Sequence, residues 1–197
     1  MLAHYVRFFF ALLRALFTFR FKHPLEPGRI SVRIMPWDLD FNLHANNSIF
    51  LQLMDLGRFG LVCRSGMLYR HLRRGWLPVL SGVTVYYLRP LRPFDKVVLE
   101  TGIASWNEKY WFLEHRFLVG GELRAVSWEK GAHYKGGKAV PTDRMMEVAG
   151  VSGQPPKMPA EMKRWAESRD ALASRRVRGP GSGLTPSPAT RDSLLQS

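Results

Sequence analysis

The feature that most constrains the fold is a succession of long strand patterns in the middle of the chain. Four apolar-rich stretches follow one another at residues 77–88, 96–106, 109–119 and 122–134. At roughly 3.3 Å per residue, strands of about eleven residues span about 36 Å, which is long for an ordinary sheet. The turns between them are short enough for antiparallel neighbours and lie at residues 89–93, 106–108 and 120–121. The chain therefore predicts one long antiparallel meander.

A single long helix is expected before this meander. From Asn47 to about Arg64, apolar residues and two glycines form a stripe about half the helix circumference wide, so the helix must be largely enclosed. Gly57 and Gly60 lie on this stripe, where each costs about 1 kcal/mol of helix propensity, and we expect close backbone approach to a sheet at both. An alternating strand is expected at residues 29–36. The predicted fold is α+β, a buried helix wrapped by a curled antiparallel sheet.

Composition narrows the class of protein and its partners. The chain has 197 residues, 46% of them hydrophobic, which suits one domain with tails. Its 29 basic and 16 acidic residues give a formal charge of +13, which favours nucleic acid, an anionic membrane face or a phosphate-bearing small molecule as partner. Because the basic residues are scattered through tails and loops, we do not expect nucleic-acid binding. The single Cys63 allows no internal disulfide and suggests a buried thiol in the cytoplasm.

The two ends of the chain differ from its middle. Residues 1–22 predict a basic amphipathic helix, and Arg7 and Arg14 interrupt the apolar run that a membrane-spanning helix requires. This helix lies in the interface of an anionic membrane, on the inner face, or docks on the protein or a second subunit, with a signal anchor as a third interpretation. The main domain is expected at residues 29–150. An extension at 151–197 carries a short helix near 159–173 and a tail with too little apolar surface to order itself.

A dense polar segment, Trp37 to Phe50, connects the first strand to the helix. Asparagine is a common helix N-cap, so capping is the favoured role for Asn46 and Asn47. Asp38 and Asp40 either satisfy loop amides or take part in chemistry. Each role remains open from the residues alone.

The order of these elements resembles the hotdog-fold thioesterases of the hydroxybenzoyl-CoA thioesterase type. Asp38-Leu39-Asp40, then His44-Ala45-Asn46-Asn47 and Phe50, match a D-x-D, G-H-V-N-N and aromatic pattern, with Leu43 in place of the usual glycine and Phe50 in place of tyrosine. YYLRPLRPFDKV is similar to the strand and proline turn that follow the helix in the family. The sequence PKMPAEMKRWAESRDALASRR resembles a segment of animal thioesterase-superfamily-like proteins and their bacterial relatives, and the similarity spans residues 29–175.

The resemblance implies an acyl-CoA or acyl-ACP thioesterase. Asp40, Asn42 and His44 match the D-x-N-x-H of plant acyl-ACP thioesterases, where these residues are implicated in catalysis. We expect Asp40 to act as base or nucleophile, His44 as its hydrogen-bond or proton partner and Asn42 to orient substrate or water, with Asp38 as the alternative carboxylate. Backbone N–H groups at Asn46 and Asn47 would stabilise the oxyanion. The alternative is a non-catalytic acyl-binding hotdog protein at a membrane surface.

Other charged and imidazole side chains complete the expectations. Arg70, Arg73 and Arg74 either bind the CoA phosphates or form a solvated cluster, the latter slightly favoured, within a basic loop at residues 69–76. Residues 135–138, with two glycines, are a weak phosphate candidate. Three further histidines, His71, His115 and His133, have no partner at a recognisable spacing and are interpreted as structural. We expect neither a cofactor nor a bound metal.

An oligomer follows from the expected sheet and from the resemblance. A curled meander leaves an edge strand exposed, and pairing with a second copy would cover it. Hotdog proteins place their active sites between subunits. A homodimer, or a higher homo-oligomer, is therefore expected.

Overall fold

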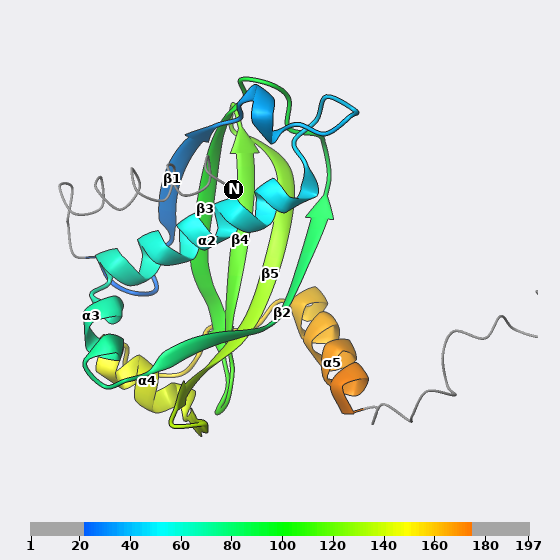
Figure 1. The fold of residues 1–197 in the computed structure, drawn as a ribbon. Coiled ribbons are helices and arrows are strands. Elements are labelled where there is room, and N and C mark those ends of the chain that lie inside the picture. The colour runs from blue at the N-terminus through cyan, green and yellow to red at the C-terminus, as the bar shows by residue number, and fades with distance from the viewer. Residues whose placement is uncertain (1–21, 175–197) are drawn as a thin grey trace, which may run out of the picture. The chain divides into compact units, whose positions relative to one another are not determined.

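A computed structural model describes residues 22–174 of the chain. The predictions for residues 1–21 and 175–197 lie outside this range. Figure 1 shows a curved sheet with one long helix lying across it. The elements are β1 (Gly28–Arg33), η1 (Pro36–Asp38), α2 (Asn47–Arg64), α3 (Met67–Leu72), β2 (Leu77–Tyr87), β3 (Lys96–Trp106), β4 (Trp111–Val119), β5 (Glu122–Lys135), β6 (Lys138–Val140), α4 (Thr142–Ala149) and α5 (Ala160–Ser174). The expected α+β fold is confirmed. Helix α5 belongs to a second compact unit that begins at residue 160.

The sheet is antiparallel, with strand order β1-β3-β4-β5-β2 and with β6 paired to β5. Consecutive strands β3, β4 and β5 are neighbours because their turns are short. Strand β2 forms one edge of this order. Along that edge strand, large apolar side chains are exposed in the single chain: Leu77, Val79, Leu80, Val83, Tyr86 and Tyr87.

The core has two parts, one at each half of α2. The first half of the helix packs Phe50, Leu53 and Met54 against sheet residues that include Leu99 and Phe117. Phe50 meets Phe117 edge to face, with ring centroids 5.0 Å apart. The second cluster surrounds the end of α2 and the short helices α3 and α4, and it includes Leu61, Met67, Trp76, Trp111, Met145 and Met146.

The two glycines on α2 have different roles. A Cβ on Gly57 would lie 2.3 Å from Thr101 Oγ1 of β3, so the expected close approach is confirmed there. At Gly60 the nearest atom to such a Cβ is Ile30 Cγ2 at 3.7 Å, an ordinary contact. The prediction of close approach at Gly60 is therefore wrong, because Gly60 faces the Ile30 side chain of β1 at an ordinary contact distance, whereas Gly57 faces β3.

The predicted element boundaries agree with the structure to within a few residues, and the short elements were missed. Helix 47–64 and strand 96–106 are found as predicted, and the other strands differ at one or both ends. The predicted basic loop is wrong in part, because Met67–Leu72 forms α3 after Gly66, whose φ is 69°. Residues 136–137 form the hairpin turn between β5 and β6, with positive φ at both glycines. Such brief elements carry too few residues to show a periodic pattern.

Within residues 22–174, no helix is long and apolar enough to cross a membrane. The amphipathic segment predicted at residues 1–22 lies almost wholly outside the described residues.

Candidate functional site

The segment between η1 and α2 folds as a tight turn around the carboxylate of Asp40. Asp40 Oδ1 accepts a hydrogen bond from the Asn42 N–H at 2.8 Å and a long one from the His44 N–H at 3.5 Å. The backbone closes the same turn, since the Asp40 N–H donates to the His44 carbonyl at 2.8 Å and the Leu43 N–H donates to the Asp40 carbonyl at 3.0 Å. Leu43 has a positive φ of 57°. The turn therefore brings Asp40, Asn42 and His44 together.

The side chains of this turn are not joined to one another. Asp40 and His44 are half-buried and Asn42 is exposed. The contacts of Asp40 with Asn42 and His44 run through backbone N–H groups, and within residues 22–174 Asp40 Oδ2 accepts no hydrogen bond. One carboxylate oxygen thus orders the loop, and the other remains available to a water molecule or a ligand.

Asp38 has a different environment from Asp40. Its side chain is buried, with 2% of the residue exposed, and its Oδ2 accepts a hydrogen bond from the Met35 N–H at 2.7 Å. The Asp38 carbonyl accepts a second bond, from the Asn46 N–H at 2.8 Å. These contacts favour the interpretation in which Asp38 satisfies loop amides and holds the start of α2 in place.

Asn46 is the N-cap of α2, as the sequence predicts. Its Oδ1 accepts a hydrogen bond from the Ser48 N–H at 2.9 Å, and its carbonyl accepts one from the Ile49 N–H at 2.9 Å. These two bonds use the N–H groups of Ser48 and Ile49, two of the backbone donors at the start of α2. Within residues 22–174, the Asn47 N–H has no hydrogen-bond partner. This amide can still donate to an anion.

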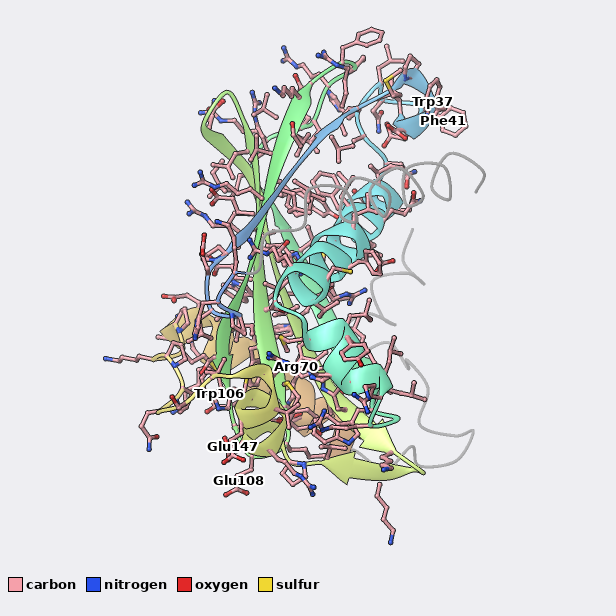
Figure 2. All side chains as sticks on the ribbon, turned by 90° about the vertical axis from the view of Figure 1, so that its left-hand side faces the viewer. Trp37, Phe41, Arg70, Trp106, Glu108 and Glu147 are labelled. Carbon is pink, nitrogen blue, oxygen red and sulfur yellow. The ribbon has the colours of Figure 1, made fainter. Side chains whose placement is uncertain are left out.

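Apolar side chains surround the turn and face solvent. Trp37, Phe41, Leu43 and Phe94 are exposed, and Figure 2 shows Trp37 and Phe41 together at one end of the molecule. Phe94 lies in the β2–β3 loop, which the Ala45 N–H joins to the turn by a 2.9 Å bond to the Leu91 carbonyl. Its φ of 65° is positive, like that of Leu43. Apolar residues in such strained positions at a loop tip are typical of contact surfaces.

A second feature, a pocket of about 350 Å³, lies beside the latter part of α2. Helices α2, α3 and α4 and strands β2 to β5 contribute to its walls. Asp55, one of the lining residues, is eight residues beyond Asn47, the first residue of α2. The two residues are therefore about 12 Å apart along the helix axis, at ~1.5 Å per residue. Pockets of roughly 300–1,000 Å³ are the usual size for small ligands. Sequence reasoning missed this pocket entirely.

Two histidines that the sequence left without partners meet in this pocket. The ring centroids of His71 and His133 are 4.6 Å apart, and that of Trp111 is 6.3 Å from His133. Burial lowers the pKa of His71 to about 4, with Arg74 and Arg70 contributing, and burial lowers the pKa of His133 to about 4, with His71 contributing. Both imidazoles are therefore neutral at physiological pH.

A chain of buried polar groups connects the core to the pocket. Thr101 Oγ1 lies 3.0 Å from His115 Nδ1, and His115 Nε2 lies 3.2 Å from Glu129 Oε2 without the alignment of a hydrogen bond. Glu129 Oε2 also accepts from Arg58 Nη1 at 3.0 Å, and Arg58 pairs with Asp55. The interpretation of His115 as structural agrees with this placement, since Gly57 covers Thr101 from the helix side.

The arginine cluster is bound to the protein itself. Arg70 Nη1 donates to the Ala149 carbonyl at 2.7 Å and so joins α3 to α4 (Figure 2). Arg73 donates to the Tyr69 hydroxyl at 3.1 Å. Arg74 donates to the Arg70 carbonyl at 3.0 Å and lies over the Trp76 ring. These contacts give no support to a phosphate site at this cluster.

Comparison with known proteins identifies relatives of this chain. Protein THEM6 of Xenopus laevis is 34% identical over 98 residues, which are 50% of this chain and 47% of that protein. A probable thioesterase of Saccharomyces cerevisiae is 26% identical over 120 residues, 59% of this chain and 52% of that protein. The chain spans about half the length of these curated relatives.

Solved structures share the fold. The probable thioesterase YbaW from Escherichia coli has a TM-score of 0.58 at 18% identity and covers 61% of this chain and 94% of that one. A gentisyl-coenzyme A thioesterase has a TM-score of 0.55 at 20% identity and covers 63% of this chain and 100% of that one. At this identity the likeness shows the fold, a hotdog fold with its helix and curled sheet. Because the family model described as the thioesterase-like superfamily matches residues 34–166, the chain belongs to that superfamily.

Proposed function

We propose that this protein hydrolyses an acyl thioester, carried on CoA or on an acyl carrier protein, to a free acid and a thiol. The observation that carries the proposal is the arrangement at the start of α2. The turn leaves two groups without partners within residues 22–174: Asp40 Oδ2, two residues after the Pro36–Asp38 turn, and the Asn47 N–H, at the helix N-terminus. A carboxylate and an amide donor are the two groups that thioester hydrolysis requires.

In this mechanism the carbonyl oxygen of the thioester lies over the start of α2. The Asn47 N–H and the helix dipole stabilise the negative charge that develops on that oxygen. Asp40 Oδ2 removes a proton from water as the water attacks the carbonyl carbon, or Asp40 attacks that carbon itself and forms a mixed anhydride that water then hydrolyses to the free acid. The carbon–sulfur bond then breaks and the thiolate takes up a proton, for which His44 is the proposed donor, while Asn42 orients the water or the substrate.

We also propose that this protein is a homodimer or a higher homo-oligomer. The exposed apolar side chains of β2 lie along the edge of the sheet, where a second copy would cover them. The exposed side chains around the Asp40 turn offer further contact surface. Size exclusion with light scattering tests this, and a stable monomer at micromolar concentration would contradict it.

A non-catalytic acyl-binding protein at a membrane surface is the second candidate. Two observations favour it: Asp40 Oδ1 is occupied by loop amides, and the exposed Trp37 and Phe41 at one tip suit a lipid interface. Such a protein would bind vesicles and release no thiol.

The experiment that separates the two candidates measures thiol release from acyl-CoA substrates of graded chain length. We expect wild type to release thiol and Asp40→Asn to lose about 10²–10⁴-fold in rate, the usual contribution of general acid–base catalysis. Glu108→Gln is the matched control, because it removes an exposed carboxylate at the other end of the molecule from Phe41 (Figure 2). A wild type no faster than Asp40→Asn would contradict the hydrolase and leave the acyl-binding candidate.

A further inference from the structure

The pocket beside α2 has a mouth and a buried end of different chemistry. At the mouth, Leu72 and Leu80 are exposed, and the side chains of Asp55 and Arg58 are 47% and 25% exposed. The walls are apolar, with Leu61, Met67, Leu113, Met145 and Met146 among them. His71, Trp111 and His133 also line the pocket and are buried, each about 5–6% exposed. A ligand would therefore pass from a charged, wet mouth along apolar walls to a polar end.

The polar end contains two nitrogen atoms that lack hydrogen bonds. Within residues 22–174, neither His71 Nε2 nor Trp111 Nε1 has a partner, although both atoms are buried. Leaving a buried polar atom unpaired costs about 1–3 kcal/mol, so such atoms usually have a water or ligand partner. The indole N–H donates only, while a neutral imidazole nitrogen either donates or accepts. A hydroxyl or carbonyl oxygen is therefore a suitable partner for either atom.

The electrostatics of this end favour an uncharged group. His71 and His133 are neutral because burial lowers the pKa of each to about 4. The nearest cations, Arg70 and Arg74, are held by the Ala149 and Arg70 carbonyls. A charged group brought to this depth would lose its hydration without gaining an ion pair. A neutral oxygen meets no such penalty.

We propose that this pocket binds an acyl chain that carries a neutral oxygen, a hydroxyl or keto group, at its far end. The apolar body lies between α2 and the sheet, the oxygen pairs with His71 Nε2, and the carboxylate of the free acid lies at the mouth beside Arg58. This inference rests on the proposed function for the identity of the ligand as an acyl group. It adds that oxygenated acyl groups are the preferred class.

Calorimetric titration with octanoate and ω-hydroxyoctanoate tests the proposal, because the two probes differ only in the oxygen. We expect wild type to bind ω-hydroxyoctanoate about tenfold more tightly, the effect of pairing otherwise unpaired buried groups. The fluorescence of Trp76 and Trp111, which line the pocket, should change on binding. Equal affinity for the two probes, tighter binding of octanoate, or no binding of either would overturn the proposal.

His71→Phe locates the oxygen, because it keeps a ring of similar size and removes the nitrogen. We expect this variant to bind octanoate as wild type does and to bring the affinity ratio of the two probes close to one. His23→Phe, at an exposed histidine outside the pocket, is the control and should keep the tenfold ratio. A tenfold ratio that persists in folded His71→Phe would overturn the assignment. Should His71→Phe not fold, the wild-type comparison of the two probes still decides the proposal.

The test is independent of catalysis. Asp40→Asn should bind both probes with wild-type affinities, since Asp40 is not among the residues that line the pocket. Thiol release without discrimination between the probes would refute this inference and leave the proposed function standing. Different affinities for the two probes without thiol release would refute the proposed function and leave this inference standing.

Discussion

The two halves of α2 differ in how their surroundings are assembled. The start of the helix meets a turn of consecutive residues in which Asp40, Asn42 and His44 are held by local backbone bonds. The latter half meets a pocket whose polar end joins His71 of α3 with Trp111 of β4 and His133 of β5. A site made of near neighbours is visible as a motif, whereas a site made of distant segments is not. A substitution in the surroundings of one half of α2 should therefore leave the surroundings of the other half unchanged.

The largest effect on folding is expected from Glu129→Gln. Glu129 is buried and contacts both His115 and Arg58, which lines the pocket. Removing one charge from a buried pair costs about 3–5 kcal/mol, and the partial exposure of Arg58 places this change near the lower limit. Urea denaturation measures the free energy of unfolding. Glu161→Gln, in an exposed pair with Arg164, should change it by less than about 1 kcal/mol, and equal effects of the two variants would contradict the buried network.

Acid should weaken the pocket half of the molecule. His71 and His133 have pKa values of about 4 in the folded chain and an ordinary value of 6.5. Between these values the unfolded chain binds protons that the folded chain excludes, so the free energy of unfolding falls as pH falls, by a few kcal/mol in total.

The effect is best measured between about pH 6.5 and 5, above the range in which most carboxylates titrate. Thermal melts in that range should show a steeper loss for wild type than for His71→Phe. Identical slopes would mean that the imidazoles are not buried as neutral groups.

Two glycines on one helix stripe offer a matched comparison of packing. Gly57→Ala would bring a Cβ to 2.3 Å from Thr101 Oγ1, and we expect a loss of about 1–3 kcal/mol from overpacking. Gly60→Ala has room, with its nearest neighbour at 3.7 Å, and should stabilise the chain by up to about 1 kcal/mol through helix propensity. Unfolding curves of both variants decide the point, and the opposite order would mean that the helix approaches the sheet elsewhere.

The smallest effect is expected at the turn before the helix. Leu43 has a φ of 57°, a conformation that costs a residue with a Cβ about 1–2 kcal/mol. Leu43→Gly relieves this cost and adds chain entropy to the unfolded state, so we expect a net gain of less than about 1 kcal/mol. The melting temperature of the variant measures it. A clear loss of stability would show that the Leu43 side chain contributes contacts that outweigh the strain.

The accuracy of the sequence predictions follows the same division. Helix 47–64 and the Asn46 cap were predictable because periodicity and capping depend on residues a few positions apart. The long strands were predictable for the same reason. Helix α3 was missed because six residues carry no period, and Gly60 was misjudged because the curvature of the sheet cannot be read from the helix.

The candidate site was predictable only in its local part. Asp40, Asn42 and His44 were named from their resemblance to a D-x-N-x-H pattern; they lie in one turn, and their catalytic roles are a proposal. The partners of His71, His115 and His133 lie on other strands or helices. No spacing along the chain could reveal them.

The amino-acid sequence alone determined that this protein has one enclosed helix, a long antiparallel meander and a polar turn between strand and helix. These depend on side-chain periodicity and on hydrogen bonds between near neighbours. Only the tertiary structure decided which glycine touches the sheet, which buried charges pair and which polar atoms remain unpaired in the pocket. Those outcomes depend on how the sheet curves around α2, and that curvature brings together residues more than sixty positions apart, such as His71 and His133.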